Sequence, residues 1–126
     1  MSKKQHLTND APSAPHILSQ AIESNGFVFV SGQIHNKPDG TLVEGSVKDK
    51  LDQIMLNTKN VLVAAGSSLD SVVKVVIYVT DMSQMSELNE VYPSYFSEPY
   101  PVREAVCVKE LPLSATIEIS VIATKE

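Results

Sequence analysis

Residues 72–79 read VVKVVIYV, and this stretch decides how the rest of the chain can be arranged. Its β-branched residues predict a strand. Apolar side chains occupy both alternating sets of positions, with Val73, Val75, Ile77 and Val79 in one set and Val72, Val76 and Tyr78 in the other. Because successive side chains of a strand point to opposite faces, this strand is expected to be buried on both faces of its sheet.

The segments before this strand predict a hairpin and a long helix. Asn25-Gly26, between two β-prone runs in residues 17–34, is the strongest short-range signal for a hairpin. Ser46 is expected to cap a helix, with Asp49 in a weak capping-box position. Apolar residues then recur at three- and four-residue steps, and Gly66 is expected to end the helix.

The segments after the strand predict a second helix and two more strands. Residues 83–97 have an apolar side, and Pro93 lies within them. Proline inside a helix costs about 3 kcal/mol, so we expect a bend or an early end there. Residues 103–109 and 116–124 are expected to be strands, whereas residues 1–16 are interpreted as a polar N-terminal arm interrupted by prolines.

The resulting order, β-β-α-β-α-β-β, predicts an α+β sandwich with two helices packed on one face of a mixed sheet. Two helices cover only one face of a sheet of this size, yet residues 72–79 need both faces covered. Monomers rarely expose an apolar patch this large, so the other face is expected to meet a second copy of the chain. We predict an obligate homo-oligomer. The alternative is a longer loop folded over that face, but no spare segment looks suited to it.

Size and composition narrow the classes of function. The 126 residues are expected to form one domain, spanning 1–126, with a net charge of −5. Nucleic-acid binding normally leaves a basic footprint, and the sequence has none. No apolar run is long enough to span a membrane, and the first residues lack the apolar core of a secretory signal. A single cysteine fits a reducing compartment, so a cytoplasmic location is expected, with a mitochondrial or nuclear pool left open.

Two charged residues are candidates for chemistry. Arg103 is the only arginine, it follows Pro-Tyr-Pro, and every other basic residue is a lysine. A guanidinium grips a carboxylate with two hydrogen bonds, which an ammonium cannot reproduce. Glu118 lies in an otherwise apolar strand, where a carboxylate is seldom buried without a partner or a function. The alternative for both residues is an ordinary solvent-facing position.

The remaining candidates carry weaker signals. His6, His16 and His35 lack the spacing of metal ligands, so surface positions are expected for them and a metal site is not. Alternation places Cys107 on the same strand face as Arg103 and Ala105. We expect a small buried residue there, and the alternative is a nucleophile. Ser31, Gly32 and Gln33 form a small polar strand end, which a plain strand terminus explains equally well.

Several pieces of the chain, in order and spacing, resemble the reactive-intermediate deaminase family, RidA/YjgF, also called endoribonuclease L-PSP. The similarity covers nearly the whole sequence. Its pieces are NDAPSAP at 9–15, SQA at 19–21, VFVSGQI at 28–34, the long segment 43–82, NEVYPSYF at 89–96, PVR at 101–103 and LPLSATIEISVIA at 111–123.

The resemblance implies a chorismate-mutase-like subunit that forms a homotrimer with a site in each cleft between subunits. The family hydrolyses reactive 2-imino acids, such as 2-iminobutanoate and 2-iminopropanoate, to 2-oxo acids and ammonia without a cofactor. Arg103 matches the residue that clamps the substrate carboxylate, and Glu118 matches the residue that positions or activates water. Gly32 and Ser31 match the pocket wall, and Asn89 matches a position near the cleft.

Two departures from the family pattern leave other functions open. Leu18 stands where the family usually has an aromatic residue, and Ala105 stands where it usually has a cysteine. The loss of a tyrosine hydroxyl and ring puts substrate range and rate in doubt more than fold. The second hypothesis is therefore a trimeric module that binds a small carboxylate or a partner with little turnover. Third is the RNA-cleaving, translation-inhibiting activity behind the older family name, which the acidic composition argues against.

Overall fold

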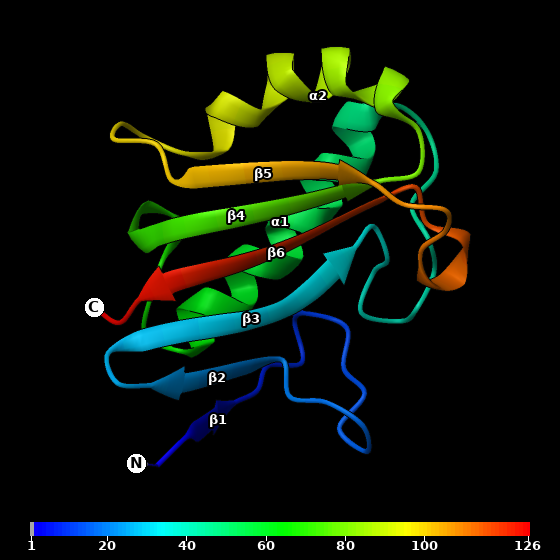
Figure 1. The fold of residues 1–126 in the computed structure, drawn as a ribbon. Coiled ribbons are helices and arrows are strands. Elements are labelled where there is room, and N and C mark those ends of the chain that lie inside the picture. Colours follow the sequence, from blue (N-terminus) through cyan, green and yellow to red (C-terminus); the bar gives the residue numbers. More distant parts are fainter. Residues whose placement is uncertain (1) are drawn as a thin grey trace.

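The computed structural model describes residues 2–126, which form a six-stranded mixed sheet with two α-helices on one of its faces (Figure 1). The strand order is β1-β2-β3-β6-β4-β5, and all neighbours are antiparallel except β4 and β5. The strands are β1 (Lys4–His6), β2 (Ala21–Ser24), β3 (Phe27–Ile34), β4 (Val72–Val79), β5 (Val102–Cys107) and β6 (Ile117–Thr124). The helices are α1 (Val47–Ala64) and α2 (Met85–Val91), with short 3-10 turns η1 (Leu69–Ser71), η2 (Met82–Gln84), η3 (Tyr92–Tyr95) and η4 (Pro112–Ser114).

The local signals for the hairpin and the first helix are confirmed. Asn25 and Gly26 connect β2 to β3 with φ values of 52° and 84°, as a tight two-residue hairpin turn requires. The Ser46 side chain accepts a hydrogen bond from the Asp49 N–H at 3.1 Å, and the Asp49 carboxylate accepts one from the Ser46 N–H at 3.3 Å. This reciprocal pair satisfies two backbone donors that the start of a helix leaves free.

The second helix is shorter than the sequence predicts. The α-helical part ends at Val91, and the chain continues as η3, which contains Pro93. The early end expected at this proline is confirmed, because its ring cannot follow the preceding α-helical turn. Leu88, Tyr92 and Phe96 continue the same buried side across the change from α to 3-10 geometry.

The interpretation of residues 1–16 as an arm is wrong in part, because residues 4–6 form the edge strand β1. They pair with β2 in antiparallel register, from Lys4 opposite Glu23 to His6 opposite Ala21. The His6 ring lies 2.9 Å from the Glu23 carboxylate, which the sequence pattern does not reveal. Three paired residues are too few for an alternating pattern to be visible.

The two faces of the sheet differ in what covers them. On the side of α1 and α2, β4 and β6 bury alternate residues completely, among them Val75, Ile77, Ile117 and Ile119. On the other side no helix covers the sheet (Figure 1), and Phe27, Phe29, Val102 and Val106 are exposed. One helix-covered face is therefore confirmed, and no described loop folds over the other. Cover by a second copy of the chain stays a prediction.

None of the described helices has the length and apolar character needed to cross a bilayer. The cytoplasmic location expected from the composition stays a prediction.

The expected surface position of His35 is wrong, because its side chain is completely buried. The Nδ1–H donates to the carbonyl of Val43 at 2.8 Å, and Nε2 accepts from the N–H of Thr116 at 3.0 Å. The ring thus ties the loop after β3 to the start of β6. Burial lowers the pKa of His35 from 6.5, and the nearby Lys50 lowers this pKa further, while Glu44 and the bond to Val43 act in the opposite direction.

We expect the free energy of unfolding to fall as the pH drops through about 6.5, because the unfolded chain then binds a proton that buried His35 accepts less readily. Urea unfolding between about pH 7.5 and 5.5 measures this loss, in a range above the titration of exposed carboxylates. The raised pKa of Glu118 affects the wild type and the variants alike. His35→Gln should be less stable at the upper pH and lose less stability over the range. His16→Gln, at an exposed position, is the control. An unchanged pH dependence in His35→Gln would contradict the assignment.

Candidate functional site

A cavity of about 440 Å³ opens where β3 ends and β6 begins. Three segments form its walls: the loop of residues 12–20, the end of β3 with the residues that follow it, and η4. Of the residues singled out in the sequence, five line this one cavity: Leu18, Ser31, Gly32, Gln33 and Glu118. The topology therefore brings together side chains from segments up to 100 positions apart in the chain.

A bulge in β3 shapes the floor of the cavity. Val30 pairs with Val121 and Gln33 with Ile119, so Ser31 and Gly32 together lie opposite the single residue between those partners. A bulge bends its strand and re-aims the neighbouring side chains. The Ser31 hydroxyl donates to the carbonyl of Ser19 at 2.6 Å, which fixes the loop wall to the bulge.

Gly32 leaves the space that the Glu118 carboxylate occupies. A Cβ at position 32 would lie 2.3 Å from Oε2 of Glu118 and 3.0 Å from its Cδ. No cationic side chain of residues 2–126 lies within ion-pair distance of this carboxylate. Burial raises the pKa of Glu118. A half-buried carboxyl without a counter-ion can both accept and release a proton closer to neutral pH than an exposed one.

Gln20 holds the loop wall in place, a role that the sequence analysis did not identify. Its Nε2 donates to the carbonyls of Thr8, Ala11 and Pro12 at 3.0, 3.2 and 2.9 Å, and its Oε1 accepts from the Thr8 N–H at 2.8 Å. The side chain is almost completely buried. A glutamine between Ser19 and an apolar strand is the only signal in the sequence, and it does not predict these partners.

The rest of the cavity wall is mostly apolar. Leu18 is 43% exposed, and Ile17 and Leu113, which the sequence analysis did not single out, are exposed beside it. Leu113 has a φ of 57°, which is unfavourable for a bulky side chain. Such strain is found where the surrounding structure holds a residue in place, often at functional sites. The signal in the sequence was an apolar residue inside the turn Pro112–Ser114.

Arg103, Ala105 and Asn89 do not reach this cavity. Arg103 pairs with Val75 and therefore points to the helix-covered side of the sheet, whereas Glu118 pairs with Tyr78 and points to the uncovered side. The guanidinium carbon of Arg103 lies 4.9 Å from the centroid of the Tyr92 ring. Within one chain, Arg103, Ala105 and Asn89 thus lie apart from the predicted site residues that line the cavity.

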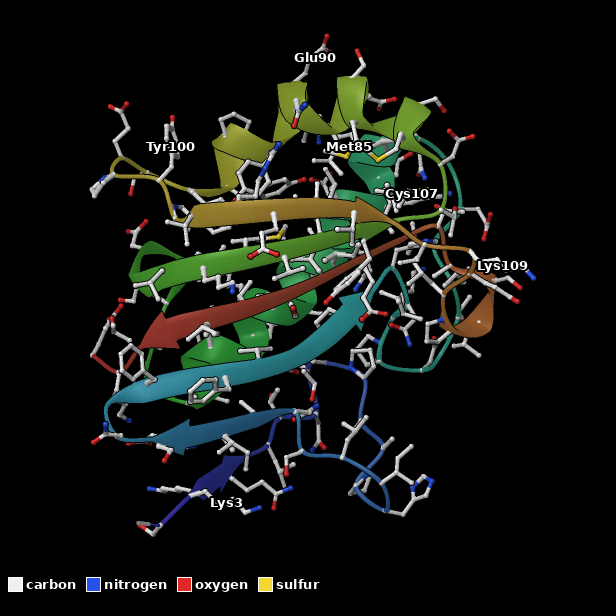
Figure 2. All side chains as sticks on the ribbon, in the orientation of Figure 1. Lys3, Met85, Glu90, Tyr100, Cys107 and Lys109 are labelled. Atoms are coloured by element: carbon white, nitrogen blue, oxygen red, sulfur yellow. The ribbon has the colours of Figure 1, made fainter. Side chains whose placement is uncertain are left out.

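Cys107 is exposed, so the interpretation as a small buried residue is wrong. It lies at the end of β5 opposite Val79 (Figure 2), and alternation along the strand places it on the same side as Arg103 and Ala105. Because β5 is an edge strand that the helices only partly cover, Arg103 and Cys107 remain open to solvent, whereas Ala105 is partly buried against the core. Among residues 2–126, the thiol hydrogen-bonds only to the carbonyl of Val108, at 3.9 Å, and has no side-chain base or cation as a hydrogen-bond partner.

Comparison with known proteins identifies relatives along the whole chain. The family model described as endoribonuclease L-PSP matches residues 8–125. Protein HMF1 of Saccharomyces cerevisiae is 44% identical over 94% of this chain and 92% of its own length. Reactive Intermediate Deaminase A, chloroplastic, of Arabidopsis thaliana is 42% identical over 98% of this chain and 67% of its own. The fold superposes on the crystal structure of yeast Mmf1 with a TM-score of 0.96, over 99% of this chain and 100% of the other, and the two sequences are 41% identical.

We expect Gln20→Ala to loosen the cavity wall and to lower the free energy of unfolding by about 2–3 kcal/mol, because one buried donor and three carbonyls lose their partner. Hydrogen exchange should accelerate at the amide of Thr8, which donates to Gln20 in the wild type and loses this acceptor in the variant. Gln5→Ala, at an exposed position of β1, is the matched control and should change neither measurement. Equal exchange at Thr8 in both variants would contradict the role assigned to Gln20.

Proposed function

The chain belongs to the reactive-intermediate deaminase (RidA/YjgF) family, whose family model is described as endoribonuclease L-PSP, and on this premise we propose that it hydrolyses 2-imino acids such as 2-iminobutanoate and 2-iminopropanoate. One relative carries the name Reactive Intermediate Deaminase A, which supports this choice. The observation that carries the proposal is Glu118, a half-buried carboxyl with a raised pKa and no counter-ion in a largely apolar cavity.

Glu118 suits the proton transfers of imine hydrolysis. Water adds to C2 of the protonated imine, C=NH2+, while the Glu118 carboxylate accepts one proton from the water, which gives a neutral carbinolamine with OH and NH2 on C2. The protonated carboxyl then gives this proton to the nitrogen. The C–N bond breaks as the carboxylate accepts the hydroxyl proton, so that ammonia and a 2-oxo acid are released, and the proton left on Glu118 passes to ammonia or solvent. A raised pKa brings Glu118 closer to the operating pH, where one group performs both steps efficiently. Imine hydrolysis is fast without a catalyst, so holding the water and the imine carbon together suffices.

Arg103 suits the carboxylate of the same substrate, but only from a neighbouring chain. Its planar fork can bind a carboxylate through two parallel hydrogen bonds. Because it projects from the opposite side of the sheet to Glu118, no rotamer change brings the two together within one subunit. We therefore propose that Arg103 of one copy completes the cavity that holds Glu118 of the next.

This arrangement implies a closed ring of subunits. The Arg103 edge and the Glu118 cavity are different surfaces, and contacts between different surfaces generate rings when the rotation closes. The uncovered apolar face of the sheet supplies surface for such an assembly. A homotrimer, with one shared site at each of its contacts, is the proposed form.

A binding module with little turnover is the second candidate, and Leu18 favours it. The residue lines the cavity but offers neither a ring nor a hydroxyl to a ligand. In that case the protein would bind 2-oxobutanoate without accelerating formation of the 2-oxo acid from its imine. The cavity and the Arg103 clamp would be the same in both functions.

Single variants and their mixture test the proposal. The imine is generated from threonine by a pyridoxal-phosphate-dependent dehydratase, and formation of the 2-oxo acid is followed. Arg103→Ala, Arg103→Lys and Glu118→Gln should each lower the acceleration by about 10- to 100-fold. Co-expressed Arg103→Ala and Glu118→Gln subunits should regain roughly a quarter of the wild-type acceleration, because one shared site in four then receives both intact residues.

The outcomes of this experiment separate the alternatives. No acceleration by the wild type, together with binding of 2-oxobutanoate, selects the binding module. If Arg103→Ala accelerates hydrolysis as much as the wild type, Arg103 does not bind the substrate carboxylate. Inactive mixtures from assembled subunits contradict a site shared between chains.

Gly32→Ala should lower the acceleration while leaving the fold nearly as stable. The new methyl overlaps only the end of the Glu118 side chain, which can move at little cost to stability, but the carboxylate then leaves its place in the cavity. We expect a loss of about tenfold or more in kcat/KM and a change below about 1 kcal/mol in the free energy of unfolding. Gly40→Ala is the control, since a Cβ there meets no atom within 4 Å, although its φ of 93° adds some backbone strain. Full activity in Gly32→Ala would show that the position of the carboxylate does not matter.

A further inference from the structure

Tyr92 connects the hydrophobic core to the guanidinium of Arg103. It is the first residue of η3, directly after α2, and its side chain is buried. Its ring centroid lies 5.1 Å from that of Phe96 and 4.9 Å from Cζ of Arg103. The same ring therefore contacts both the core and the only arginine of the chain.

The Tyr92 ring is the contact that restrains Arg103. No carboxylate of residues 2–126 lies within ion-pair distance of the guanidinium, and β5 leaves the side chain exposed. A cation over an aromatic face is attracted by the negative charge density of the ring. A guanidinium held in this way keeps its N–H groups available for a carboxylate, which a salt bridge within the chain would occupy.

The ring of Tyr92, rather than its hydroxyl, carries this role. The hydroxyl is buried and has no hydrogen-bond partner among the described residues. Burial of an unpaired hydroxyl lowers the stability of the fold. Stabilisation of the core by the hydroxyl therefore does not explain why a tyrosine is found at position 92. Phenylalanine offers the same apolar body and a comparable face to the cation.

We propose that Tyr92 is a positioning residue for the carboxylate clamp: its ring holds the Arg103 guanidinium in place with its donors free. A 2-imino or 2-oxo acid then meets a fork that is already ordered, and less conformational freedom is lost on binding. The identity of this ligand rests on the proposed function. The contact between ring and guanidinium does not depend on it.

The single arginine makes this contact directly measurable. The chain has one Nε–Hε group, so its NMR resonance is assigned without ambiguity. In the wild type it should be shifted upfield by the Tyr92 ring, and Tyr92→Leu should abolish that shift. We expect Tyr92→Leu to raise the Kd of 2-oxobutanoate and the KM of the imine by about three- to tenfold, with kcat within about twofold.

Two further variants separate positioning from stability. Tyr92→Phe should restore the upfield shift and most of the lost affinity, and it should unfold at the same or a higher temperature because the unpaired hydroxyl is removed. Tyr95→Leu is the matched control in the same turn: its hydroxyl donates to Asp52 and its ring does not lie over Arg103. This control should lower the unfolding temperature without changing the Arg103 resonance or the Kd.

Each result decides one question. Equal Kd values for wild type and Tyr92→Leu overturn the proposal, as does equal weakening in Tyr92→Leu and Tyr95→Leu. Failure of Tyr92→Phe to restore affinity would also overturn it, because the hydroxyl would then be required. If the wild type binds 2-oxobutanoate but hydrolyses no imine, the proposed function fails while the positioning role is still decided by the resonance and the Kd. If Arg103→Ala binds as tightly as the wild type, Arg103 is not the clamp and the positioning role of Tyr92 fails with it, whereas imine hydrolysis at Glu118 is decided separately by the rate assay.

Discussion

The alternation of side chains across β4, β5 and β6 governs the rest of this molecule. The set of positions that buries Val75 and Ile77 beneath the helices also directs Arg103 to that side, because β5 pairs with β4 in register. The opposite set contains Glu118. The helix-covered core must keep its apolar residues inside, so the register cannot slip by one residue without exposing them. The separation of the guanidinium from the carboxylate is thus a consequence of the core itself.

The proposed assembly with a second chain rests on this separation and on the uncovered apolar face. The face exposes aromatic and aliphatic side chains on β3 and β5, and no described segment folds over it. The cavity at the ends of β3 and β6 contains a carboxyl but no cation, while the guanidinium stands at the far edge of the sheet on an aromatic ring. The proposed assembly would cover the apolar face and bring the guanidinium of one subunit to the carboxyl of the next.

Within the cavity, polar groups fall into two kinds. Gln20 and Ser31 donate hydrogen bonds to backbone carbonyls and hold the walls in place. These donor groups are therefore not available to a ligand. Glu118 has no such partner, and its pKa is raised by burial. Gly32 permits this arrangement by lacking a side chain. Leu18 lines the cavity at the position where the family pattern usually has an aromatic residue.

Short-range signals in the sequence were sufficient for the local elements, because their causes are local. Asn25 and Gly26 form the hairpin turn, Ser46 and Asp49 exchange the hydrogen bonds that cap α1, and Pro93 lies in the 3-10 turn at which α2 ends. Arg103 and Glu118 also stood out as a lone arginine and a carboxylate in an apolar strand. Only the tertiary structure decided which candidates share a cavity, that His35 is buried and Cys107 exposed, and that Tyr92 lies under Arg103. These features depend on strand order and register, which bring together residues distant in the chain and which no local pattern encodes.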